Sequence, residues 1–255
     1  VAVVGNDTAG ATLRTALDTG RMRSRSLVTV ARPTTTKTRV MARSQQLVRF
    51  DEEEDADLTP DEIARVLAAI EQALPDATAM VFEDYNKGVL VPAVIEGAIA
   101  LATARGLPVV VDPKFRNFFA YRGATVFKPN RRELESALGA AVDLEHPAAL
   151  PTTFARLGVD HLLLTLGEHG MALVSADGVV HRVPTTAREV YDVVGAGDTV
   201  TAYLATMLAA GASALEAAIV ANFAAGVEVG KLGAATVSAD EVLEAYDQHL
   251  AESQD

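Results

Sequence analysis

Short apolar segments alternate with helix-like segments along most of this chain, and each apolar segment leads into a polar motif. These segments lie at about 79–82, 107–111, 126–127 and 161–166. Apolar strands that are each followed by a helix are typical of a mostly parallel sheet covered on both faces. The carboxyl ends of such strands share the edge where α/β sheets bind ligands. The alternation therefore predicts the α/β class and a site built from the polar motifs.

Capping residues mark where two of the helices begin. Thr59 and Glu62 form a capping box, with Pro60 at the first helical position. Ser213 and Glu216 have the same spacing further along the chain. We expect helices to start directly after Thr59 and after Ser213.

Two segments interrupt the alternation. Residues 32–54 are rich in Thr, Val and Arg and alternate in polarity, which predicts two antiparallel strands joined near Ser44. Inserted between strand–helix units, this hairpin would project from the sheet as a lid. The second segment, 171–184, predicts a β-hairpin with Asp177 and Gly178 in its turn.

Composition limits the classes of function. A length of 255 residues favours one domain over 1–255, with 32–54 as an excursion. The net charge is 22 − 34 = −12, which argues against a nucleic-acid partner. The absence of cysteine excludes disulfides, thiolate nucleophiles and cysteine-bound metals. No apolar run reaches the roughly 18–20 residues of a membrane span and no signal peptide is visible, so we expect a cytoplasmic protein without a membrane partner.

The strongest local motif lies at 192–199, where Gly195, Ala196 and Gly197 lead into a helix. Small residues leave the first backbone N–H groups of a helix open, and these donors suit a phosphate. Asp198 follows at the helix start, where a carboxylate beside an anion site is placed to accept a proton from a hydroxyl group. The alternative is an ordinary helix start in which Asp198 only complements the dipole.

Two further motifs are weaker when taken alone. Asn130 and Glu133 lie three residues apart after a strand, where Glu133 could help to hold Mg²⁺ through water or could pair with a basic neighbour. Thr165, Gly167 and Gly170 also follow a strand, and they fit either a nucleotide-phosphate loop or a plain turn. The motifs at 84–88 and 112–114 bring the number at strand ends to five.

Three of these motifs, in this order along the chain, resemble those of the PfkB/ribokinase family of carbohydrate kinases. They are PNxxE at 129–133, TxGxxG at 165–170 and GAGD at 195–198. Within that family the chain is most similar to the heptose 7-phosphate kinases of ADP-heptose biosynthesis, a source of lipopolysaccharide core precursors. The narrower likeness rests on segments 33–51, 83–90, 111–114, 189–199 and 224–238.

The resemblance implies a three-layer α/β/α sandwich with a β lid, and ATP-dependent phosphorylation of the anomeric hydroxyl of a heptose 7-phosphate. Asp198 would be the general base, and the amides of Gly195, Ala196 and Gly197 would form the anion hole. The cofactors would be ATP and Mg²⁺, with Glu133 acting on the metal through water and a monovalent cation such as K⁺ near 192–196. Contacts to ATP are implied for Asn130, Glu133, Thr165, Gly167, Gly170 and Asn222. Contacts to the sugar phosphate are implied for Asp84, Lys87, Lys114, Arg39 and Arg49, with Lys37 also in the lid.

The chain departs from the family pattern in places. Val194 stands where the family commonly has Thr, and Glu83 replaces a smaller residue. The first strand and part of the lid are missing from the beginning, which corresponds to roughly fifty residues. We expect an upstream part that carries the sugar-binding Asp.

Three alternatives stay open. The chain could be another sugar or nucleoside kinase of the family, since GAGD alone does not select a substrate. It could be a non-catalytic sugar-phosphate-binding protein on the same fold. A bifunctional enzyme with a nucleotidyltransferase module is the third, but no His-x-Gly-His motif occurs, so we expect a kinase only. The partly apolar lid predicts a homodimer formed through it.

Overall fold

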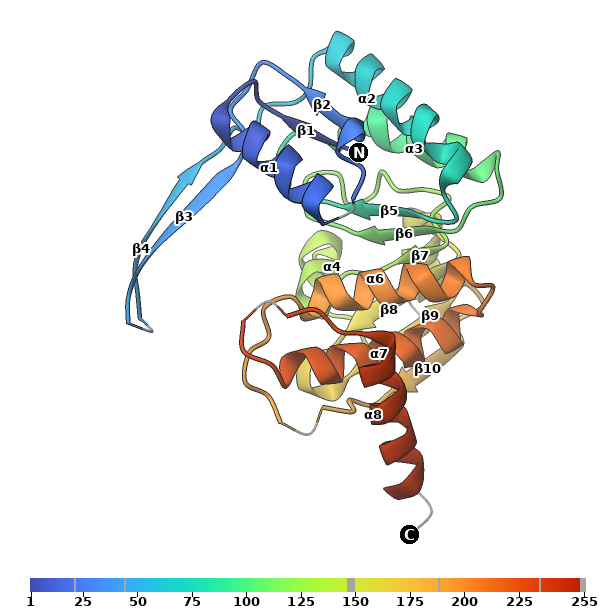
Figure 1. Cartoon of the computed structure of the whole chain (residues 1–255). Helices are drawn as coiled ribbons and strands as arrows, with labels where there is room; N and C mark the ends of the chain where they lie inside the picture. The colour runs from blue at the N-terminus through green and yellow to red at the C-terminus, as the bar shows by residue number, and fades with distance from the viewer. Residues whose placement is uncertain (21, 44, 146–149, 188, 234, 253–255) are drawn as a thin grey trace. The chain divides into compact units, whose positions relative to one another are not determined.

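The computed structural model describes residues 1–20, 22–43, 45–145, 150–187, 189–233 and 235–252 (Figure 1). The chain forms two compact units. Unit 1 consists of Val1–Ala77 and Tyr85–Leu101, and unit 2 of Thr78–Asp84 and Ala102–Asp255. The organisation as a single domain stays a prediction.

Unit 2 is built on a six-stranded sheet with the order β10-β9-β8-β7-β6-β5. Strands β5 to β8 are parallel to one another, whereas β9 and β10 form an antiparallel hairpin with β8. The strands are β5 (Met80–Glu83), β6 (Val109–Asp112), β7 (Val126–Phe127), β8 (His161–Thr165), β9 (Met171–Ser175) and β10 (Val180–Val183). The predicted parallel sheet and the 171–184 hairpin are confirmed. In that hairpin the turn residue Gly178 has φ +85°, which glycine adopts without strain.

The central strands of this sheet are buried on both faces. Val110 and Leu163 pack against Leu204 of α6 (Ala196–Ala209) and Ala218 of α7 (Ala214–Val229). Figure 1 shows α6 and α7 lying side by side over the sheet. Leu162, which points to the opposite face from Leu163, is also wholly buried. This double burial is what the continuous apolar runs predict.

The remaining helices of unit 2 are α4 (Arg131–Leu138), α5 (Leu150–Leu157), α8 (Ala239–Glu252) and the short 3₁₀ helix η4 (Gly167–His169). The predicted cap of α7 is confirmed, because Ser213 and Glu216 form a capping box. Helix α8 packs against α7, where Tyr246 lies edge-on to Phe223.

Unit 1 contains the parallel pair β1 (Ala2–Val4) and β2 (Leu27–Thr29). Its helices are α1 (Thr8–Thr19), α2 (Pro60–Ala73), most of α3 (Pro92–Thr103), and the 3₁₀ helices η1 (Ser24–Ser26) and η2 (Leu74–Asp76). The capping box predicted for α2 is confirmed. Val30, Val66 and Val94 form the centre of this unit's core.

The predicted lid is the antiparallel hairpin of β3 (Thr36–Ala42) and β4 (Gln45–Glu52). The predicted junction at Ser44 lies outside the described residues. Figure 1 shows the hairpin extending away from the rest of unit 1. Val40 lies opposite Val48, and these two side chains and Phe50 remain exposed.

Among the residues that the structure describes, no helix is both long and apolar enough to cross a membrane.

Candidate active site

The first turn of α6 presents open backbone donors. Gly195 caps the helix with φ 101°, a left-handed conformation that favours glycine. The Ala196 amide donates to the Val193 carbonyl at 3.4 Å, so it is not free as the motif led us to expect. In the described part of the chain, the amides of Gly195, Gly197 and Asp198 have no protein acceptor. These three donors form the anion site at the helix start.

Three carboxylates meet at the carboxyl edge of the sheet in unit 2. Glu83 and Asp112 lie opposite each other at the ends of β5 and β6. One oxygen from each of these two residues and from Asp198 lies within 4.8 Å of the others. The predicted common edge therefore brings the ends of two strands to the GAGD motif. These three carboxylates are the described group that could hold a metal ion.

A lysine that the sequence analysis did not select joins this group. The buried Lys128 follows β7, and its Nζ donates to Asp112 Oδ2 at 2.9 Å. A Cβ atom on Gly197 would lie 3.8 Å from that Nζ, so the positive charge is next to the anion site. Its position directly after a strand, before Pro129 and Asn130, was the available signal.

The charge environment of Glu83 is unusual. Loss of hydration and the nearby negative charges of Asp112 and Asp198 raise the pKa of Glu83 to about 7, although its side chain as a whole remains exposed. Lys128 and the hydroxyl of Thr201 oppose the rise. Glu83 is therefore the carboxyl group of this cluster that holds a proton near neutral pH.

The PNxxE motif forms a helix cap. Asn130 Oδ1 accepts from the Glu133 amide at 2.8 Å, and Glu133 Oε2 accepts from the Asn130 amide at 2.9 Å. The other oxygen of Glu133 accepts from Lys114 Nζ at 2.9 Å. Lys114 Nζ also lies 3.8 Å from Asp112 Oδ1, which connects the motif to the acidic group. Pairing with a basic neighbour, the alternative considered for Glu133, is thus present.

The 165–170 loop lies beside this cap. Thr165 forms a parallel bridge with Asn130, and the two line a pocket of about 560 Å³ together with Gly167 and the basic residues Arg132 and His169. Gly170 has a packing reason to be glycine, because a Cβ there would lie 2.2 Å from the Val183 carbonyl oxygen. The structure therefore brings together Asn130, Thr165 and Gly167, as a nucleotide site requires.

Two other candidate residues are engaged in the protein interior. Asn222 Nδ2 on α7 donates to the Pro184 carbonyl at 2.8 Å. The buried Asp84 accepts from the Tyr121 hydroxyl at 2.8 Å. Both contacts hold segments of unit 2 together, and the ligand roles of Asn222 and Asp84 stay predictions.

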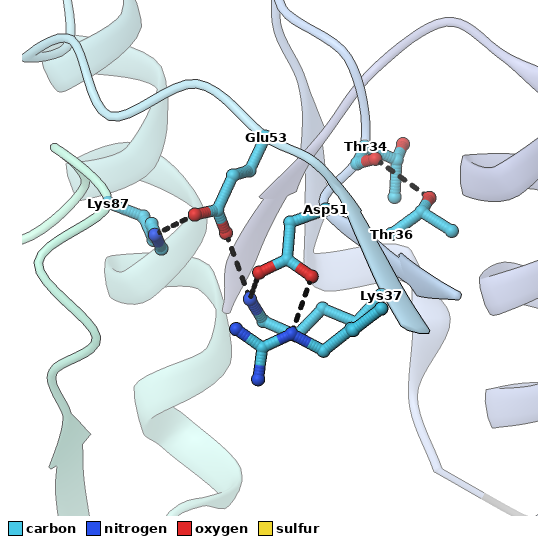
Figure 2. A network of polar contacts seen from close by, with 7 residues as sticks. Thr34, Thr36, Lys37, Asp51, Glu53 and Lys87 are labelled. Atoms are coloured by element: carbon cyan, nitrogen blue, oxygen red, sulfur yellow. Dashed lines mark hydrogen bonds and ion pairs between the residues drawn. The ribbon is translucent and has the colours of Figure 1, made fainter. Parts of the chain in front are cut away.

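The candidate phosphate-binding side chains of unit 1 form the network in Figure 2. Glu53 accepts from Lys87 at 2.5 Å and from Lys37 at 3.2 Å. Asp51 accepts from Lys37 and from Arg49. Hydrogen bonds from Lys87 and then Lys37 lower the pKa of Glu53, so its carboxylate stays ionised and occupies both ammonium groups.

Arg39 differs from the other basic residues of the lid. It lies directly across the hairpin from Arg49. In the described part of the chain it has no ion-pair partner. Two like charges facing each other across strands are unfavourable unless an anion lies near them.

A buried acid on α7 was also missed. Glu228 is wholly buried, and neither carboxylate oxygen has a hydrogen-bond partner within bonding geometry, although the nearby Ala235 amide favours the ionised form. Burial, followed by the charges of Asp192 and Asp198, raises the pKa of Glu228. An acidic residue within an otherwise apolar helical run was the signal in the sequence.

Comparison with known proteins gives relatives over the whole chain. The chain is 45% identical to "Bifunctional protein HldE" of Rhodospirillum rubrum over 258 residues, covering 100% of the chain and 52% of that protein. It is 48% identical to the protein of the same name from Gluconacetobacter diazotrophicus, with 95% and 51% covered. The chain thus spans about half the length of these curated relatives.

Solved structures share the fold. Ribokinase of Arabidopsis thaliana, complexed with ribose and ATP, has a TM-score of 0.74 at 21% identity, covering 96% of this chain and 80% of that one. Phosphofructokinase-2 of Escherichia coli, in complex with potassium, has a TM-score of 0.74 at 20% identity with the same coverage. The fold is therefore the ribokinase-like α/β/α sandwich that the motifs predicted. The profile of the pfkB family carbohydrate kinases matches residues 1–241. The chain belongs to the pfkB family of carbohydrate kinases.

Proposed function

We propose that this chain transfers the γ-phosphoryl group of ATP to the anomeric hydroxyl of a heptose 7-phosphate. The observation that carries the kinase reaction is the position of Asp198 in the first turn of α6, beside the open amides of Gly195 and Gly197. The choice of heptose rests on the likeness of the lid and of segments 83–90 and 111–114 to heptose 7-phosphate kinases.

The chemistry needs one proton acceptor and several fixed donors. The sugar oxygen attacks the γ-phosphorus as its proton passes to the Asp198 carboxylate, and the bond from phosphorus to the ADP oxygen breaks. The open amides and the Lys128 ammonium group offset charge on the transferred group. The products are a sugar phosphate and ADP, and the proton leaves Asp198 to water.

We infer that ATP lies along Asn130, Thr165 and Gly167, because these residues line one pocket. Mg²⁺, which neutralises triphosphate charge when bound, would be held by Glu133 through water. Both Glu133 oxygens already accept a hydrogen bond, from Lys114 and from the Asn130 amide. Contact through water leaves both bonds intact, so the residue fits that role.

The existing phosphate of the sugar would bind to basic side chains of the motifs and the lid. Arg39 and Arg49 support this role, since the two guanidinium groups face the same side of the hairpin and an anion would relieve their repulsion. Lys87 and Lys114 would take part by exchanging an acidic partner for a phosphate oxygen.

A monovalent cation such as K⁺ would bind near 192–196. Glu228 supports this proposal, because a buried carboxylate without a donor requires either a proton or a cation. Asp192 and Asp198 add negative charge around it.

We also infer a homodimer through the lid, in the cytoplasm, where ATP is available. Val40, Val48 and Phe50 form an exposed apolar face of a two-stranded hairpin, which is too small to be stable alone. A second copy of the same face would cover it.

The function is tested with the natural protein, Mg-ATP and a panel of sugar phosphates and free sugars. We expect ADP release to be fastest with heptose 7-phosphate, with a new anomeric phosphate in the ³¹P NMR spectrum. Faster turnover of ribose or fructose would overturn the proposed substrate. Binding of a sugar phosphate without ATP consumption would instead indicate a non-catalytic binding protein.

A further inference from the structure

The candidate reaction site holds more negative charge than a phosphoryl transfer tolerates well. Carboxylate oxygens of Glu83, Asp112 and Asp198 lie within 4.8 Å of one another, and the incoming phosphates add further negative charge. The facing cations are Lys128, bonded to Asp112, and Lys114, shared between Asp112 and Glu133. One of the three carboxyl groups must therefore lose its charge when the phosphates bind.

The three groups differ in how their charges are offset. Asp112 has the hydrogen bond from Lys128. Asp198 lies in the first turn of α6, where the helix dipole favours an anion. In the part of the chain that the structure describes, Glu83 has no ion-pair partner, and its contact is the hydroxyl of Thr201. Glu83 is thus the group for which a proton is least costly.

The Thr201 hydroxyl also shows how that proton is held. Thr201 Oγ1 donates its single hydrogen to the Gly197 carbonyl at 3.0 Å. Its oxygen is then left to accept a hydrogen bond, and a protonated Glu83 can donate one. The resulting chain runs from Glu83 through Thr201 to Gly197, which is part of the anion site.

We propose that Glu83 is a positioning residue that holds a removable proton beside Asp198 and so lowers the negative charge of the site when phosphates bind. This inference rests on the proposed kinase function. The groups that face Glu83 are Asp112 on β6, Asp198 and Thr201 on α6, and Lys128 after β7. The raised pKa of Glu83, about 7, agrees with this assignment.

The test compares KM for Mg-ATP and kcat over roughly pH 6 to 8.5. In the parent, KM should rise by about threefold or more as pH increases and Glu83 ionises, with a smaller change in kcat. Glu83→Gln keeps the size of the side chain without a titrating charge, so its KM should stay nearly constant. Asp160→Asn is the matched control, because the exposed Asp160 directly precedes β8, at the opposite edge of the same sheet. It should reproduce the parental profile.

A second readout does not depend on catalysis. The carboxyl carbon of Glu83, assigned by its loss in Glu83→Gln, should titrate in ¹³C NMR near pH 7 rather than near 4.5. An ordinary midpoint, or a parental KM profile in Glu83→Gln, would overturn the proposal. So would a profile that shifts with Mg²⁺ concentration equally in both proteins, since a cation would then neutralise the site. If no sugar is phosphorylated at all, the proposed function fails, and the NMR midpoint still decides whether Glu83 holds the proton.

Discussion

Lys128 Nζ donates a hydrogen bond to Asp112 Oδ2 at 2.9 Å, and little of either side chain is exposed. The two residues come from neighbouring strand ends, after β7 and at the end of β6. Since Gly197 lies against the same pair, the contact joins the sheet edge to the first turn of α6. Stability and chemistry therefore depend on one ion pair.

Replacing Lys128→Met should destabilise the protein strongly, because it leaves the buried Asp112 carboxylate without its partner. Loss of one member of a buried pair lowers the free energy of unfolding by about 3–5 kcal/mol. Denaturant unfolding measures the change. Lys114→Met, which removes a charge of which about a third is exposed (34%), should cost much less. Adding Asp112→Asn to Lys128→Met should restore part of the loss. Equal losses in the two lysine variants would contradict the importance of the buried pair.

Gly167 and Gly170 should respond differently to alanine. Gly167 has φ +60° with open space around it, so Gly167→Ala should cost only the left-handed conformation, about 1–2 kcal/mol. Gly170→Ala would also force a Cβ to within 2.2 Å of the Val183 carbonyl oxygen, and it should reduce the free energy of unfolding at least twice as much. Thermal melting and ATP titration of both variants separate the two effects. Equal melting temperatures with ATP binding lost only in Gly170→Ala would assign Gly170 to the ligand alone.

Local patterns were sufficient for much of the fold. The capping box of Thr59 and Glu62 and the apolar run of β8 depend on neighbouring residues, so the sequence alone predicted them. The Lys128–Asp112 pair and the orphaned Glu228 could not be predicted in this way. They depend on which distant segments pack together, and one sequence does not show those contacts. The site is intermediate, since strand ends predict a shared edge but not which carboxyl group there keeps a proton.

Asp198→Asn should reduce turnover by at least about a hundredfold, because the amide cannot accept the hydroxyl proton. The affinity for ATP should change little, since the open amides and the 165–170 loop remain. Turnover and ATP binding are measured beside the parent, with thermal melting as the control for folding. Glu189→Gln, an exposed acid nearby, is the control for loss of a charge and should keep parental turnover. Near-parental turnover in a folded Asp198→Asn protein would reduce Asp198 to a helix-capping role.

Phe50→Asp should convert the proposed dimer to a monomer, because it places a charge in the apolar face shared with Val40 and Val48. Light scattering at micromolar concentration measures the molar mass. Met41→Asp is the matched control, since Met41 is also exposed but alternates to the other face of β3 from Val40. A parent that is monomeric at this concentration, or a Met41→Asp variant that dissociates equally, would contradict a dimer formed through this face.

Glu228→Met should stabilise the protein at pH 8 by about 1–3 kcal/mol, because it removes a buried carboxyl group that lacks a donor. The sign follows from the raised pKa of Glu228 in the folded state. A raised carboxyl pKa means that the folded chain binds more protons than the unfolded chain above about pH 4.5, so stability falls as pH rises through the folded pKa. The parent should therefore lose unfolding free energy between pH 5 and pH 8, and Glu228→Met should lose less.

Potassium should act on the same group. Potassium chloride should raise the melting temperature of the parent at pH 8 above its value in tetramethylammonium chloride of equal ionic strength, because a cation bound to the folded state stabilises it. Glu228→Met should show a smaller difference between the two salts. Glu241→Gln is the control of opposite sign, since Lys231 and Ser238 lower the pKa of Glu241 to about 2 and its contribution is present at neutral pH and lost on acidification. This variant should be less stable than the parent at pH 8 while keeping the response to potassium. If Glu228→Met keeps the full potassium response, the cation binds without help from that carboxylate, and Glu228 is neutralised by its proton alone.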